Sequence, residues 1–197
     1  MFLLELHHGL FSDSFDLEAP RHDGWRLITP CDRNLPRYDP RGKELVYQLE
    51  DVAAICPFFQ EAGNLDQAQF GEFVRLVKTM FNTAQSGHDW PDVMHQQVHE
   101  AGQVTVRRGS GKIEKHVIIQ FGKKKTLIRI FAFISAHGRK CALVSHMFEK
   151  PANSRKTPAK EQARSQKILQ LYFDAIDTEN IQFIDAQGGK HGFLKFV

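Results

Sequence analysis

Apolar residues recur every three to four positions in several parts of the chain, a spacing typical of amphipathic helices. The clearest case is residues 64–84, where the apolar positions are Phe70, Phe73, Val74, Val77, Met80 and Phe81. Asn64 and Gln67 predict a capping box at the start of this helix. A weaker stripe over residues 43–59 predicts an earlier helix that ends at Pro57.

Two further helices are predicted from their start signals. Asp89 with Pro91 is typical of a helix N-terminus, and this helix would run to about His99. Thr157 as N-cap with Pro158 predicts the start of the last helix. Its apolar residues are Ile168, Leu169, Leu171, Tyr172, Phe173 and Ile176.

Between these helices the pattern changes to the alternation typical of strands. Four such runs follow one another and are separated by short segments that contain glycine; they cover residues 103–108, 113–121, 126–134 and 140–148. Short turns favour antiparallel neighbours, so we expect a four-stranded antiparallel sheet with helices packed on it, an α+β fold. Shorter strands are expected at residues 2–6 and 25–28, and a hairpin with a Gly-Gly turn at residues 180–197.

The third of the four runs is apolar on both of its faces. Leu127, Phe131 and Phe133 share one face with Arg129, and the other face carries only Ile and Ala. This pattern predicts a central strand that is covered on both sides. A guanidinium in such a strand needs a partner or access to water. Arg129 is therefore either part of a structural ion pair, a residue at a strand end, or a phosphate ligand at the rim of a cleft.

The charged residues are unevenly distributed along the chain. The net charge is +3, but residues 107–167 hold 16 Lys and Arg against 3 Asp and Glu, and the remainder holds 10 against 20. A segregated basic block is the electrostatic footprint of a nucleic-acid-binding protein. The alternative is a solvated surface that the acidic part of the same chain opposes.

Several classes of protein are not indicated by the sequence. The three cysteines have no metal-ligand spacing, and reduced thiols of a cytoplasmic protein are the simplest interpretation. The first residues lack the basic segment of a signal peptide, and no apolar run approaches the length of a membrane span. His95 and His99 have the i, i+4 spacing of a zinc site, but no further ligand accompanies them. We expect no metal, no cofactor and no membrane partner.

An ordered set of short motifs lies in the basic block. It comprises an arginine in an aromatic strand, a glycine-basic turn, a strand end with histidine and lysine, and a Lys-Thr-Pro helix start. The matching residues are Arg129, Gly138, Arg139, His146, Phe148, Lys150, Lys156, Thr157, Pro158, Glu161 and Ala163. With these motifs, the segment over roughly residues 113–176 resembles the toxins of the RelE/HigB superfamily, especially the phage-derived HigB-like branch.

The resemblance implies both a fold and an activity. It implies a RelE/ParE-like domain over residues 43–179, with an N-terminal extension (1–42) and a C-terminal hairpin (180–197). The implied function is that of a toxin of a type II toxin-antitoxin system, a metal-independent endoribonuclease that cuts mRNA on the ribosome and blocks translation. Its implied partners are a cognate antitoxin, mRNA and the ribosome, in the cytoplasm.

This chemistry needs a base for the ribose 2′-OH, cations for the charge that develops on the phosphate, and an acid for the leaving oxygen. Arg129 is expected to contact the scissile phosphate and Lys150 to stabilise the transition state. His146 is a candidate acid or base, and a hydrogen-bonded core histidine is the alternative. Lys156 is a fourth candidate, and expected RNA contacts are Lys123, Lys124, Lys125, Arg139 and Arg155.

Two departures from the family pattern leave other functions open. Ala132 stands where the family has a strand tyrosine, and residues 119–121 carry no lysine where relatives often do. One alternative is a non-catalytic protein on the same fold, which binds nucleic acid or inhibits a host factor. Another is that the acidic residues 1–100 shield the basic face within the same chain.

Overall fold

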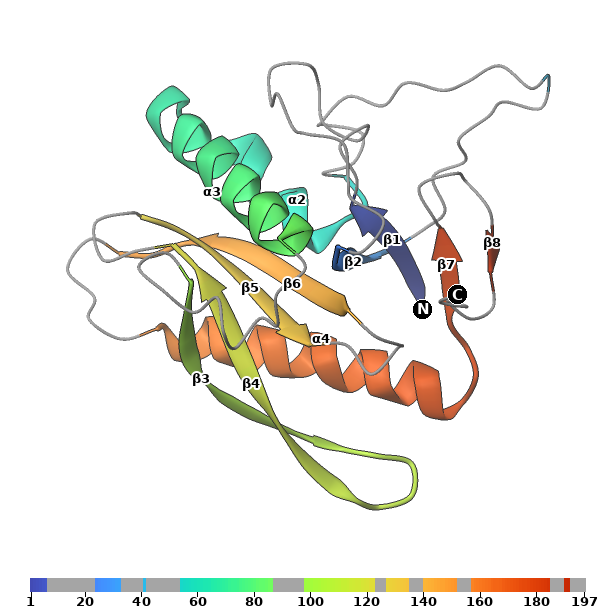
Figure 1. The fold of residues 1–197 in the computed structure, drawn as a ribbon. Helices are drawn as coiled ribbons and strands as arrows, with labels where there is room; N and C mark the ends of the chain where they lie inside the picture. Colours follow the sequence, from blue (N-terminus) through green and yellow to red (C-terminus); the bar gives the residue numbers. More distant parts are fainter. Residues whose placement is uncertain are drawn as a thin grey trace.

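One mixed β-sheet runs through the described part of the chain, and helices lie on both of its faces (Figure 1). The computed structural model describes residues 1–6, 24–32, 41, 54–86, 98–122, 127–134, 140–151, 157–184 and 190–191. The helical elements are α2 (Pro57–Gln60), the 3-10 helix η3 (Ala62–Asn64), α3 (Gln67–Gln85) and α4 (Ala159–Asp177). The strands are β1 (Phe2–Leu6), β2 (Arg26–Cys31), β3 (Val98–Arg107), β4 (Ile113–Phe121), β5 (Ile128–Ile134), β6 (Cys141–Glu149), β7 (Gln182–Ile184) and β8 (Lys190–His191).

The four predicted meander strands form one half of this sheet. Among the described residues the strand order is β3-β4-β5-β6-β2-β1-β7-β8, and β3 to β6 are antiparallel neighbours. Beyond β6 the sheet continues with β2, which is parallel to β6, and with β1, which is antiparallel to β2. The α+β class is therefore confirmed, but the four-stranded antiparallel sheet is wrong. The parallel β2–β6 pair joins strands more than a hundred residues apart, which no local pattern reveals.

Strands from the N-terminal and C-terminal parts of the chain pair in this added half of the sheet. β1 pairs in parallel with β7, and the Met1 carbonyl accepts a hydrogen bond from the Gln182 backbone N–H at 2.9 Å. β7 pairs antiparallel with β8, which confirms the predicted C-terminal hairpin for the residues described. The strand expected at residues 2–6 is confirmed, and the one expected at 25–28 begins one residue later and extends to Cys31.

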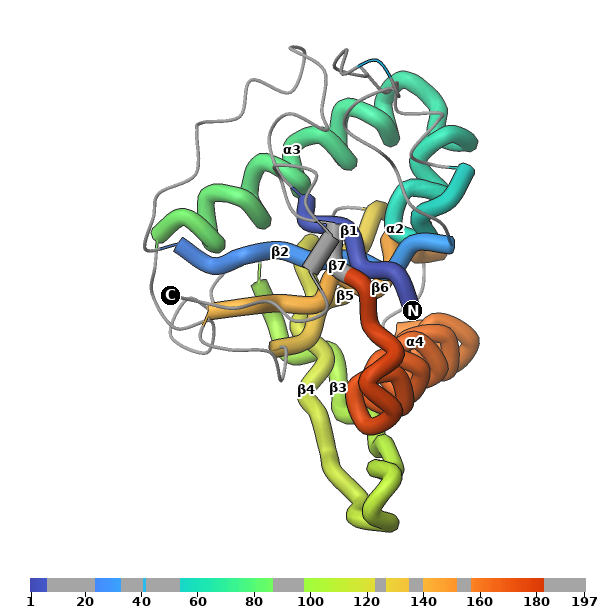
Figure 2. Tube along the Cα trace, turned by 90° about the vertical axis from the view of Figure 1, so that its right-hand side faces the viewer, coloured from blue at the N-terminus to red at the C-terminus, as the bar shows by residue number. Residues whose placement is uncertain are grey.

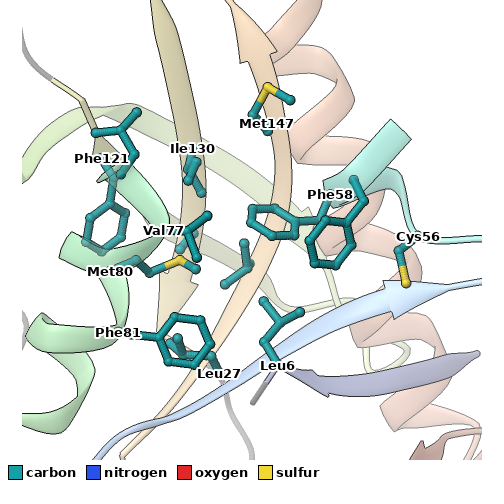
Figure 3. Close-up of a cluster of buried hydrophobic side chains, with 14 of the residues drawn as sticks. Leu6, Leu27, Cys56, Phe58, Val77, Met80, Phe81, Phe121, Ile130 and Met147 are labelled. Atoms are coloured by element: carbon teal, nitrogen blue, oxygen red, sulfur yellow. The ribbon is translucent and has the colours of Figure 1, made fainter. Parts of the chain in front are cut away.

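The sheet has an apolar core on each face. α2 and α3 cover one face, where Val77, Met80 and Phe121 pack with Ile130 of β5 (Figure 3). α4 covers the other face, where Phe131 packs with Tyr172 and its neighbours. β5 therefore sends alternate side chains into both cores, as predicted for a strand covered on both sides.

α3 confirms the predicted apolar stripe but starts later than expected. Asn64 ends a 3-10 turn, and the capping box is formed instead by Asp66 and Gln69. The Asp66 carboxylate accepts from the Gln69 backbone N–H at 2.8 Å, and the Gln69 side chain accepts from the Asp66 backbone N–H at 3.0 Å. Both pairs fit the same sequence pattern, and the preceding turn decides between them.

Two other helix predictions are corrected. Pro57 begins α2 rather than ending a helix, since a proline at the first helical position loses no hydrogen bond. Val98 and His99 belong to β3, so the helix predicted to run to about His99 is wrong at its end. Most of that segment, including His95, lies outside the described residues, as do residues 43–53.

The last helix also begins slightly later than expected. α4 has Pro158, not Thr157, at its N-cap position. In the described part of the chain, no helix combines the length and the apolar composition needed to span a bilayer. The most conspicuous departure from a compact outline is the hairpin of β3 and β4, which projects beyond the rest of the sheet in both views (Figures 1 and 2).

Candidate functional site

Arg129 and Lys150 lie at the same end of the sheet, on neighbouring strands. Arg129 is near the start of β5, and its register partner on β6 is Phe148. Lys150 directly follows β6, and its backbone N–H donates to the Leu127 carbonyl at 2.6 Å. The antiparallel ladder therefore brings together two of the basic residues that the sequence singled out.

The Arg129 side chain is buried at this end. It is 2% exposed, and its Nη1 donates to the Ile128 carbonyl at 2.7 Å. Burial lowers the pKa of Arg129, and the negative charge of Glu72 on α3 acts in the opposite direction. In this position the guanidinium is not accessible to a ligand in solvent. Its positive charge still acts on nearby groups such as Lys150.

Gly122 makes room for this arginine. It follows β4 with a φ of +115°, a backbone conformation that side chains disfavour. A Cβ atom here would lie 2.7 Å from the Ile128 carbonyl oxygen and 3.0 Å from Cδ of Arg129. The first glycine of the predicted Gly-Lys-Lys-Lys turn therefore has a local reason, which is the close passage of the chain over the Arg129 side chain.

Lys150 is partly exposed and is the accessible member of the pair. Burial lowers its pKa from the ordinary value of 10.5, and the positive charge of Arg129 lowers it further. A lysine with a lowered pKa is neutral more often near neutral pH, and a neutral amine accepts a proton. The same residue in its charged form stabilises a phosphate, so the arrangement suits either role.

Helix α3 contributes polar groups to this end of the sheet. Gln69 Nε2 donates to Glu149 Oε1 at 2.8 Å, and the Leu127 backbone N–H donates to Glu72 Oε2 at 3.4 Å. Neither Glu72 nor Gln69 is predicted as a site residue from the sequence. No pattern marks them, because both lie on the polar side of a helix that was recognised from its apolar stripe.

His146 occupies a different environment, inside the protein. Its side chain is 0% exposed, with Nδ1 3.1 Å from Ser145 Oγ and Nε2 3.2 Å from Glu161 Oε2 on α4. Ser145 Oγ also lies 3.3 Å from Ser165 Oγ. Burial lowers the pKa of His146 to about 3, with a smaller contribution from Arg164.

This group of residues contains a serine, a histidine and a carboxylate, the side chains of a nucleophilic triad. All of them are buried, with Glu161 at 6% exposure, so a substrate has no access to them. The network instead joins β6 to the first turns of α4. The structure thus places His146 in the core, as in the second of the two interpretations that the sequence left open.

The other predicted site residues, Lys123, Lys124, Lys125, Arg139, Arg155 and Lys156, lie outside the described residues. The chain flanking residues 123–126, Gly122 and Leu127, lies at the Arg129 end of the sheet. Ile134 and Lys140, which flank residues 135–139, lie at the opposite end of β5 and β6. The predicted site residues outside the described ranges remain predictions.

Within the described ranges, no three His, Cys, Asp or Glu side chains are close enough together to hold a metal ion. The three cysteines, Cys31, Cys56 and Cys141, are buried and carry free thiols. Comparison of the chain with protein-family models, with curated proteins and with solved structures finds no match.

Proposed function

We propose that this chain is a toxin of the RelE/HigB type, a metal-independent endoribonuclease that cuts mRNA on the ribosome and is held inactive by a cognate antitoxin in the cytoplasm. The observation that carries the proposal is the pairing of an accessible Lys150 with a buried Arg129 at one end of the sheet. Both residues belong to the motifs on which the resemblance rests.

In this proposal Lys150 performs the chemistry and Arg129 supports it. Lys150 takes the proton of the ribose 2′-OH as its oxygen bonds to the adjacent phosphorus; the bond from phosphorus to the 5′-oxygen breaks, and the leaving 5′-oxygen takes a proton from water. Two features make a lysine suitable as base, namely partial burial and a neighbouring cation, and both act on Lys150. The positive charge of Arg129 also favours the charge that develops on the phosphorane.

The test is to map new mRNA 5′ ends in a translating bacterial extract. The unaltered protein should generate ends that require ribosomes. Lys150→Ala should reduce their rate of formation about 100-fold or more, the usual contribution of general base catalysis. Lys160→Ala is the matched control, since this lysine is 83% exposed on α4 and lies outside the predicted site.

A second substitution separates the two roles of Lys150. Arginine keeps the positive charge but does not release its proton near neutral pH. Lys150→Arg should therefore be as inactive as Lys150→Ala if Lys150 is the base, and should keep part of its activity if a cation suffices. Absence of ribosome-dependent ends, or full activity of Lys150→Ala, would overturn the proposal.

One observation favours a second candidate, a non-catalytic nucleic-acid-binding protein or inhibitor on the same fold. His146 is fully buried and Arg129 nearly so, which leaves Lys150 as the one accessible group among the predicted catalytic residues that the structure describes. Translation arrest with intact mRNA would identify this candidate. Lys150→Ala would then weaken the arrest only slightly, because phosphate contacts in a binding protein add up.

A further inference from the structure

The projecting hairpin of β3 and β4 has one face that no described element covers. The register pairs Gln103 with Val117, Thr105 with Lys115, and Arg107 with Ile113. Paired residues share a face, so these six side chains lie together, and all six are exposed. Ile113 is 60% exposed.

The opposite face of the hairpin is fixed to α4. Val104 and Val106 are buried there, and the guanidinium of Arg108 lies 4.6 Å from the centre of the Phe173 ring. Arg108 also donates to Asp177 through Nε and Nη2, and the Gly109 backbone N–H donates to the same carboxylate at 2.6 Å. The hairpin of residues 98–121, called the arm below, is therefore held against α4, and its other face, the free face, has a fixed orientation.

The outer edge of β3 is closed by side chains of α4. Gln166 Nε2 donates to the Thr105 carbonyl at 3.0 Å, and Gln170 both donates to the Arg107 carbonyl and accepts from the Arg107 N–H. Gln162 Nε2 donates to the Ala101 carbonyl at 3.4 Å. These glutamines form hydrogen bonds with the backbone N–H and carbonyl groups of β3 to which a strand of a partner would have to bind. A partner is therefore not expected to add a strand at this edge of the sheet.

The free face is positively charged. Arg107 and Lys115 are diagonal neighbours across the two strands, which sets their Cα atoms roughly 7–8 Å apart. Neither forms an ion pair with any described residue, and the nearby acids Glu114 and Asp177 are engaged by Arg108 and Lys112 on the other side. Glu100, at the base of the arm, is the exposed acid on this side of β3.

We propose that this face of the β3–β4 hairpin is a docking surface for the phosphate backbone of structured RNA. Arg107 and Lys115 supply the charge, and Thr105 and Gln103 supply neutral hydrogen-bonding groups of the kind that position phosphates. The proposal rests on the proposed function, because it makes ribosomal RNA the partner of the arm. It differs from that function in its residues, since the arm carries no group of the Lys150 site.

The test is a titration of purified ribosomes, and of a labelled ribosomal RNA hairpin, with the full chain at several salt concentrations. The double charge reversal Arg107→Glu/Lys115→Glu should weaken binding at least tenfold and reduce the salt dependence by about two counterions. The matched control is Lys160→Glu/Lys167→Glu, which changes the net charge equally on exposed positions of α4. It should weaken binding less than threefold.

A gain of charge provides a second variant. Thr105→Arg should tighten binding and steepen the salt dependence, because position 105 is exposed between the two cations. Equal losses in both charge-reversal variants would overturn the assignment to the arm. Unchanged RNA affinity of the arm variant would overturn the assignment to RNA. The binding titration does not depend on cleavage, so the two proposals fail in different assays. The nuclease proposal fails if Lys150→Ala cuts mRNA like the unaltered protein in the 5′-end mapping, whatever the binding titration of the arm variant shows.

Discussion

Acidification should destabilise this protein through His146, a buried side chain between β6 and α4. The folded protein holds the imidazole neutral, because burial lowers its pKa from 6.5 to about 3. The unfolded chain exposes the imidazole to water, where it binds a proton below about pH 6.5. Between these two values the unfolded state binds more protons than the folded state, so the free energy of unfolding must fall as the pH falls.

The size of the effect follows from the difference between the two pKa values. Each unit corresponds to about 1.4 kcal/mol, so the interval from 6.5 to about 3 gives an upper limit of about 5 kcal/mol. A limit of this size is comparable to the whole stability of many domains. Burial also lowers the pKa of His116, which adds a contribution of the same sign.

The measurement is urea denaturation at a series of pH values from about 7 to about 4. His146→Gln removes the titrating group while keeping an amide within reach of Ser145 and Glu161. This variant should be less stable near pH 7 but should lose much less stability on acidification. The matched control is the same substitution at His99, which is exposed on β3. An equal loss of stability with and without His146 would refute the reasoning.

Three further predictions concern the folding of named elements. Gly122→Ala should lower the free energy of unfolding, measured by heat or urea, by about 1–3 kcal/mol, because φ is +115° and the added Cβ would meet the Ile128 carbonyl. Gly71→Ala in α3 is the control: its Cβ would meet no atom within 4 Å, and the substitution should raise the free energy of unfolding by roughly 0.5–1 kcal/mol. Asp66→Ala should cost about 1 kcal/mol by removing the capping box of α3. Asp177→Asn should loosen the β3–β4 turn, seen as faster amide hydrogen exchange at Gly109, whose N–H it binds.

Local periodicity was sufficient for the elements whose pattern is self-contained. β4 has the predicted bounds, since alternation and flanking glycine turns define a hairpin strand without reference to the rest of the fold. The two faces of β5 were also predicted, because a strand covered on both sides is apolar at successive positions. The apolar stripe of α3 is confirmed because helical periodicity is also a local pattern. The capping pair is Asp66 and Gln69 and not the predicted Asn64 and Gln67.

Non-local pairing set the limit of the sequence analysis. The parallel contact of β2 with β6 depends on which strand edge is free after the meander has formed, and neither strand carries a signal for its partner. The glutamines of α4 illustrate the same limit, since Gln166 and Gln170 look like ordinary exposed helix residues until β3 lies beside them. The candidate site has the same limit: the sequence singled out Arg129 but left open whether it is a structural residue of a covered strand or a phosphate ligand at a rim, and its burial was seen only in the folded chain.

The direction of a pH profile would decide how Lys150 works, because its two possible roles have opposite signs. The pKa of Lys150 lies below 10.5 through burial and the charge of Arg129. A base must be neutral, so the rate of mRNA cleavage would rise with pH until it levels at this pKa. A stabilising cation must be charged, so the rate would fall over the same range.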